Sequence, residues 1–142
     1  MPHPIPLQGF DHIVLRIRDK ARMIGFYTEV LGCSLEWDRP ELGLAHLRAG
    51  RDLIDLVTLD GPLGMAGGRG PAAEGRNLDH FCLRVAPFDE AAIRRHLAAC
   101  GVEITDAGRR FGAAGEGPSL YVRDPEGNTV ELKGQPSERA PG

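Results

Sequence analysis

Apolar and polar residues follow one another along this chain in a pattern that occurs twice. Residues 10–18 read Phe-Asp-His-Ile-Val-Leu-Arg-Ile-Arg, and residues 78–85 read Leu-Asp-His-Phe-Cys-Leu-Arg-Val. The two strings share the order apolar-Asp-His-apolar-x-Leu-Arg-apolar, and each is interpreted as the first strand of its half. A pattern that recurs in this way indicates that the chain is built from two similar modules.

A helical pattern follows each string. In both halves an Asp stands at the start, apolar residues recur at the three- and four-residue spacing of an amphipathic helix, and a Gly stands at the end. We expect Asp19 and Asp89 to cap the helix starts, and Gly32 and Gly101 to end the helices. The apolar positions are Met23, Phe26, Tyr27, Val30 and Leu31 in the first helix, and Ile93, Leu97 and Cys100 in the second.

Strand-like segments follow each helix, so each half reads β-α-β-β-β. The pattern predicts strands at residues 33–37, 43–47 and 53–58, and again at 102–105, 119–122 and 129–132. The prediction is an α+β fold with one domain over residues 1–142 and modules at 8–59 and 78–134. The Gly- and Pro-rich residues 60–77 are interpreted as a flexible linker, 108–118 as an access loop, and 135–142 as a flexible tail.

Composition narrows the class of protein. The chain has 142 residues, 42% of them hydrophobic and 26% charged, as in ordinary globular domains. A net charge of −3 without a basic stripe excludes a nucleic-acid partner. No apolar run approaches the roughly 18 residues of a membrane span, and the start does not read as a signal peptide. The three cysteines form no disulfide or CxxC pattern, which favours the cytoplasm, and each is expected to be a small buried hydrophobe.

The repeat also duplicates residues that can bind a metal ion. His12 and His80 hold the same place in the first strand of each half, and Asp55 and Glu131 the same place in the last strand. A single His or acid in a strand is more often structural or solvated, but matched recurrence favours a site. Two imidazoles and two carboxylates suit a divalent Zn, Ni, Fe, Co or Mn ion, so we expect a four-ligand centre.

Other polar residues have two open interpretations. Arg16 and Arg84 share a strand face with the two histidines and either bind an anionic substrate or point into solvent. Tyr121 either lines a substrate pocket or packs in the core. His46 is assigned a surface or packing role because its counterpart in the second half is not a histidine.

These residues resemble those of a known family. The strings Phe10-Asp11-His12-Ile13-Val14-Leu15 and Leu78-Asp79-His80 are similar to those of the vicinal oxygen chelate superfamily. The segment Arg123-Asp124-Pro125-Glu126-Gly127-Asn128-Thr129-Val130-Glu131-Leu132 is the most specific match. The superfamily includes glyoxalase I, fosfomycin- and bleomycin-resistance proteins and extradiol dioxygenases, and the resemblance spans residues 8–134. It implies curved mixed sheets around a central metal, a substrate that chelates the metal through vicinal oxygens, and a homodimer, sometimes with ligands from both subunits.

The resemblance also implies residue roles. His12, His80 and Glu131 match the usual ligands, and Asp55 stands where glyoxalase I has a Glu ligand. This favours a lyase or isomerase that acts on a 2-oxoaldehyde thiol adduct through an enediolate, with Glu131 as the catalytic base and Asp55 serving the opposite face. Arg16 matches an arginine that holds the glutathione carboxylate in glyoxalase I.

Three other functions remain open within the same superfamily. In an Fe(II) extradiol ring-cleaving dioxygenase, His12, His80 and Glu131 would form the two-His-one-carboxylate set. A fosfomycin-resistance enzyme would add a thiol to the drug at the metal. A bleomycin-resistance-type protein would bind a drug without catalysis and would not need the metal ligands.

Overall fold

Both halves of the chain form a four-stranded mixed sheet, as the computed structural model shows for residues 3–136. The first half contains β1 (His12–Ile17), α1 (Lys20–Gly25), the π-helix η1 (Phe26–Val30), β2 (Ser34–Arg39), β3 (Leu44–Ala49) and β4 (Asp52–Thr58). The second contains β5 (Phe81–Arg84), α2 (Glu90–Ala99), β6 (Asp106–Gly112), β7 (Gly115–Arg123) and β8 (Thr129–Lys133). Short 3-10 helices occur at η2 (Pro40–Leu42) and η3 (Gly64–Gly67). The predicted α+β fold of paired βαβββ modules is confirmed.

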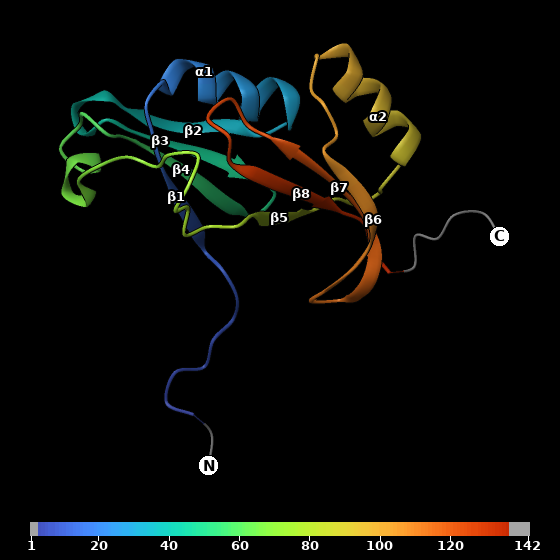
Figure 1. Cartoon of the computed structure of the whole chain (residues 1–142). Helices are drawn as coiled ribbons and strands as arrows, with labels where there is room; N and C mark the ends of the chain where they lie inside the picture. Colours follow the sequence, from blue (N-terminus) through green and yellow to red (C-terminus); the bar gives the residue numbers. More distant parts are fainter. Residues whose placement is uncertain (1–2, 137–142) are drawn as a thin grey trace.

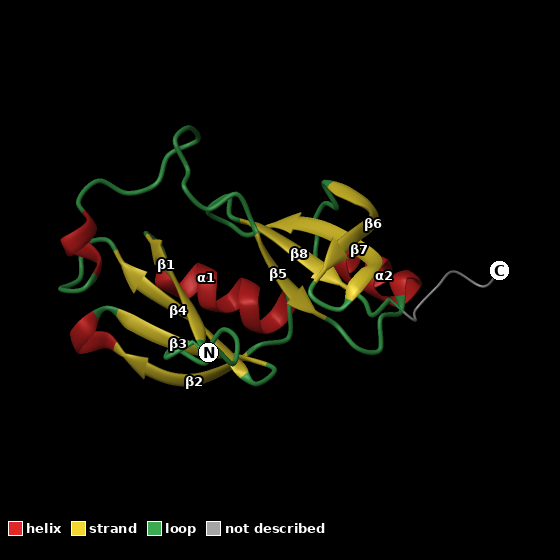
Figure 2. Ribbon diagram, turned by 90° about the horizontal axis from the view of Figure 1, so that it is seen from below, coloured by secondary structure: helices red, strands yellow, loops and turns green. Residues whose placement is uncertain are grey.

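The two sheets have the same topology. Their strand orders are β1-β4-β3-β2, here called sheet A, and β5-β8-β7-β6, here called sheet B. In each, the first strand runs parallel to the last and the other neighbours are antiparallel. The sheets lie side by side (Figure 2), and both helices lie on one side of them (Figure 1). No helix within residues 3–136 is long and apolar enough to cross a membrane.

The helix boundaries follow the predicted capping residues. The Asp19 carboxylate accepts a hydrogen bond of 3.0 Å from the backbone N–H three residues on, and Asp89 accepts one of 3.1 Å in the same way. Gly32 and Gly101 adopt φ values of +80° and +72°, which a side chain would disfavour. One backbone amide at each helix start is therefore bound by an Asp side chain in the same way in both modules.

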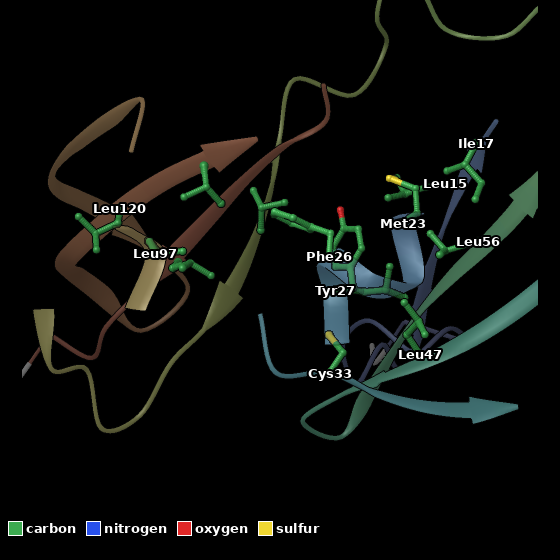
Figure 3. Close-up of a cluster of buried hydrophobic side chains, with 14 of the residues drawn as sticks. Leu15, Ile17, Met23, Phe26, Tyr27, Cys33, Leu47, Leu56, Leu97 and Leu120 are labelled. Carbon is green, nitrogen blue, oxygen red and sulfur yellow. The ribbon is translucent and has the colours of Figure 1, made fainter. Parts of the chain in front are cut away.

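One hydrophobic cluster contains buried residues of both modules. Figure 3 shows Phe26 and Tyr27 between the side chains of sheet A and those near Leu97 and Leu120 of the second module. Tyr27 has no exposed surface, and Phe26 meets its ring edge-on at 5.3 Å between centroids. The helix η1 thus places two aromatic side chains where the two modules meet.

The Asp-Pro-Glu-Gly-Asn turn between β7 and β8 also joins the modules. Asp124 is 4% exposed and accepts a hydrogen bond of 2.7 Å from the Tyr27 hydroxyl. The Glu126 carboxylate accepts hydrogen bonds from the backbone N–H groups of Arg18 and the next residue, at the start of α1. This motif therefore ties the second module to the first and fixes the entry to β8.

The second module differs from the sequence prediction at one place. Residues 102–105 form no strand, and residues 108–118, which the sequence favours as a loop, belong to the β6–β7 hairpin. The residues of β6 are mostly exposed, so backbone pairing with β7 rather than an alternating core face defines this strand. Of the predicted flexible tail, residues 137–142 lie outside the described part of the chain.

Candidate metal centre

Sheet B brings one histidine and one carboxylate together. His80, just before β5, places its Nε2 3.1 Å from Oε1 of Glu131 on β8. Glu131 is 5% exposed, and the Ser119 hydroxyl on β7 donates a hydrogen bond of 2.6 Å to its Oε2. The Tyr121 ring lies edge-on to His80 at 5.7 Å. Glu131 is thus fixed from two sides, with one oxygen directed at the imidazole.

Sheet A carries the corresponding acid, but a different residue binds it. Asp55 on β4 is 5% exposed, and its Oδ1 lies 2.9 Å from Nδ1 of His46 on β3. Trp37 on β2 stacks on the His46 ring at 5.8 Å and an interplanar angle of 27°. The hydrogen bond with Asp11 raises the pKa of His12, and the charge of Asp55 contributes a smaller increase. His46 therefore orients the buried carboxylate that His12 faces from β1.

Each candidate histidine is preceded by an aspartate that binds its ring. Asp11 Oδ1 lies 2.7 Å from Nδ1 of His12, and Asp79 Oδ2 lies 2.7 Å from Nδ1 of His80. A carboxylate that accepts from Nδ1–H directs Nε2 the other way, which at His80 is towards Glu131. A neutral imidazole held through Nδ1–H is the form that a metal ion needs. The repeated Asp-His pair fits two imidazole ligands, one on each sheet.

The strand register confirms that the two acids occupy equivalent positions. Asp55 is the cross-strand partner of His46 on β3, and Glu131 is the partner of Tyr121 on β7. The counterpart of His46 is thus Tyr121, and both contact the acid opposite them. The sequence favours a surface or packing role for His46, but its ring contacts the buried Asp55. Counting back from the tight β3–β4 turn would have placed it opposite Asp55.

The two sheets each hold half of the expected ligand set. His12 and Asp55 lie on sheet A, whereas His80 and Glu131 lie on sheet B. Within residues 3–136, no three His, Cys, Asp or Glu side chains surround a common point. The donor atoms fit a divalent metal in chemical type, but one copy of the chain does not bring the four residues together.

The two arginines of the repeat have different surroundings. The Arg16 guanidinium donates hydrogen bonds to the carbonyls of Gly64, Gly68 and Arg69 in the segment that joins the modules. Arg84 is exposed and makes no hydrogen bond or ion pair with any residue in the described part of the chain. An anion-binding role stays a prediction for both, and only Arg84 has all of its donors available.

The cysteines do not share one environment. Cys33 is buried as the sequence predicts, but Cys82 and Cys100 are exposed, so the prediction of three buried cysteines is wrong for those two. Cys82 lies on β5 opposite Glu131. Desolvation of the thiol, together with the negative charge of Glu131, raises the pKa of Cys82 to about 12. Cys82 is therefore a protonated thiol at neutral pH.

Comparison with known proteins identifies the family. The model of the Glyoxalase/Bleomycin resistance protein/Dioxygenase superfamily matches residues 9–132, and the chain belongs to this superfamily. The chain is 28% identical over 127 residues to virulence protein STM3117 of Salmonella typhimurium, covering 89% of this chain and 83% of that protein. It is 28% identical over 128 residues to glutathione transferase FosA of Serratia marcescens, covering 89% and 80%.

Solved structures show the same fold. The crystal structure of STM3117 superposes with a TM-score of 0.73 at 26% identity, covering 92% of this chain and 99% of that one. Lactoylglutathione lyase from Agrobacterium tumefaciens superposes with a TM-score of 0.65 at 22% identity, covering 92% and 96%. The fold and the superfamily are therefore established, but proteins named for different activities share them.

Proposed function

We propose that this protein is a metal-dependent enzyme of the glyoxalase I type, which moves a proton between the adjacent carbons of a 2-oxoaldehyde thiol adduct. His12, His80 and Glu131 would hold the divalent ion. The observation that carries the proposal is the buried acid on each sheet, Glu131 and Asp55, each fixed by a neighbouring side chain. A proton transfer between two carbons of a substrate held between the sheets can use an acid on either face.

The split of the ligands between the sheets supports a site shared by two copies of the chain. A two-fold dimer can place sheet A of each copy against sheet B of the other, which gives two equivalent sites. The side chains on the open faces and at their edges support such an assembly: Phe10 is 86% exposed, Val14 49% and Trp37 57%. Exposed apolar side chains in this number are typical of a surface that another molecule covers.

The chain's own residues supply the proton chemistry. A divalent ion, when bound, would polarise two adjacent substrate oxygens and acidify the neighbouring C–H. Glu131 would take that proton, and the hydrogen bond from Ser119 would hold its carboxylate at the required angle. Asp55, oriented by His46, would handle the proton on the opposite face. Tyr121, packed against His80, would line the substrate side of the same sheet.

A second candidate is thiol transfer to a small electrophile, as the name of the 28% identical glutathione transferase suggests. The hydrogen bond between Asp55 and His46 favours this candidate, because Asp55 then has another partner. His12, His80 and Glu131 remain as a set of three metal ligands. The two candidates differ in whether Asp55 moves a proton. They make opposite predictions for Asp55→Asn, which would abolish isomerisation but leave thiol transfer in place.

The test is metal content followed by activity. The purified protein should contain about one divalent ion per chain and convert the methylglyoxal–glutathione adduct. Glu131→Gln should abolish turnover while metal is still bound. Glu116→Gln, the same change at an exposed acid on β7, should leave both turnover and metal content unchanged. Full activity in metal-loaded Glu131→Gln would contradict the mechanism. Oxygen consumption with catechols would indicate the dioxygenase, and protein that binds no metal would indicate the drug-binding class.

A further inference from the structure

The open face of sheet A contains an apolar pocket next to Asp55. Its volume is about 410 Å³, within the roughly 300–1,000 Å³ of small-molecule sites. Four aliphatic side chains line it: Val14, Leu44, Val57 and Leu63. Asp55 and Arg16 complete the lining. The only carboxylate of this pocket is thus the one that His46 orients, and its remaining walls are mostly hydrocarbon.

One wall of the pocket does not belong to the sheet. Leu63 lies in the segment between the modules, directly before η3, and is 45% exposed. The sequence favours this segment as a flexible linker, yet the Arg16 guanidinium donates to the Gly64 carbonyl at 3.2 and 2.8 Å and to the Gly68 carbonyl at 2.5 Å. The Arg18 guanidinium donates to the Pro71 carbonyl at 2.9 Å. The linker is therefore held against sheet A.

Close packing explains why this segment is rich in glycine. A Cβ at Gly67 would lie 2.5 Å from Cζ of Arg16, so the guanidinium would have to move from its present position. A Cβ at Gly64 would overlap the backbone of Thr58 at the end of β4. These glycines let the linker backbone lie directly on the Arg16 side chain and the end of the sheet, which sets the position of Leu63.

We propose that this pocket receives an uncharged apolar substituent of the substrate, and that Arg16 is a positioning residue that holds the Leu63 wall in place. The proposal rests on the proposed function, because that function puts the reacting carbons beside Asp55. The substrate would be a vicinal-oxygen compound with a hydrocarbon group, such as a phenyl or branched alkyl group, next to the chelating oxygens. In this arrangement the guanidinium of Arg16 donates to carbonyls of the linker.

The pocket is tested with two hydroxamates, which chelate metal ions through adjacent oxygens. Calorimetry on Ni²⁺-loaded protein should show benzohydroxamate binding at least about 10-fold more tightly than acetohydroxamate, as expected for added carbon in an apolar pocket. Leu63→Asp should remove this preference by weakening the binding of benzohydroxamate more than that of acetohydroxamate. Met65→Asp, an exposed residue of the same segment, should keep it. Equal affinities of the unsubstituted protein for the two hydroxamates would refute only the proposed role of the pocket. Metal-loaded protein that binds neither hydroxamate would refute both the proposed function and the role of the pocket.

The positioning role of Arg16 is tested without metal. The amides of Met65 and Gly68 are hydrogen-bonded within the segment, to the carbonyls of Gly61 and Met65. Arg16→Met should raise their hydrogen-exchange rates by about 10-fold or more, because the segment then opens locally. Arg84→Met, the same change at the equivalent position of the repeat, should leave them unchanged. Unchanged exchange in Arg16→Met would refute the role.

Discussion

Replacing Asp124 by Ala is expected to weaken the contact between the two modules and so destabilise the fold. The carboxylate is 4% exposed and accepts four hydrogen bonds, from the Tyr27 hydroxyl, the backbone N–H of Glu126, and the backbone N–H and side-chain amide of Asn128. Their lengths lie between 2.7 and 3.0 Å. The substitution removes the acceptor of all four at once.

The magnitude follows from which donors remain unsatisfied. Tyr27 has no exposed surface, so its hydroxyl keeps no access to water and its loss of a partner costs about 1–3 kcal/mol. The turn amides are only partly buried and can be rehydrated, so together they add about 1–2 kcal/mol. We expect Asp124→Ala to lower the free energy of unfolding by about 3–4 kcal/mol, and the melting temperature by about 10 °C.

Urea unfolding followed by circular dichroism measures this change, and Tyr27→Phe is the matched control. Removing the hydroxyl alone should cost about 1.5 kcal/mol, because Asp124 keeps its three turn donors. The double substitution should cost less than the sum of the single ones, since Tyr27→Phe removes the group that Asp124→Ala leaves unsatisfied. A loss below about 1 kcal/mol for Asp124→Ala, or additive losses, would refute this account of the joint.

Three further predictions concern the site. Ser119→Ala removes the hydrogen bond that fixes Glu131 and should lower kcat about 10-fold at unchanged metal content, measured by steady-state assay and elemental analysis. His46→Gln removes the hydrogen-bond partner of Asp55 and should also lower kcat at unchanged metal content. If the variant loses metal, Asp55 is a metal ligand. The Cys82 thiol, with a pKa of about 12, is ionised only as the pH rises towards that value. Its alkylation rate, followed by mass spectrometry, should therefore rise about tenfold per unit between pH 8 and 10, and a plateau there would contradict the raised pKa.

Much of the fold follows from local patterns. The repeated strand-helix order, the Asp caps and the glycine ends depend on residues close in sequence, and these features are confirmed. The equivalence of Asp55 and Glu131 could also be predicted, because the repeat fixes strand position. The β6–β7 hairpin could not be predicted, because the residues of β6 are mostly exposed and do not alternate between apolar and polar side chains.

The contacts of the site depend on longer-range packing. The donation of Arg16 to linker carbonyls joins residues about 50 positions apart, and nothing in the local pattern of either segment indicates it. The separation of the four candidate ligands between two sheets likewise follows from how the modules pack. The hydrogen bond between His46 and Asp55 is different, because the two residues lie on strands joined by one tight turn. The position of that turn in the sequence predicts that they are cross-strand partners.

In the proposed site, two half-sites on separate sheets are completed by a second copy of the chain. Mixing two inactive variants tests this arrangement. Co-expressed His12→Ala and Glu131→Gln chains should recover about a quarter of the normal activity, because half of the dimers carry one site with unaltered ligands from both copies. Co-expressed His80→Ala and Glu131→Gln chains, both altered on sheet B, should recover none. No recovery from the first pair, despite mixed dimers in solution, would contradict the shared site.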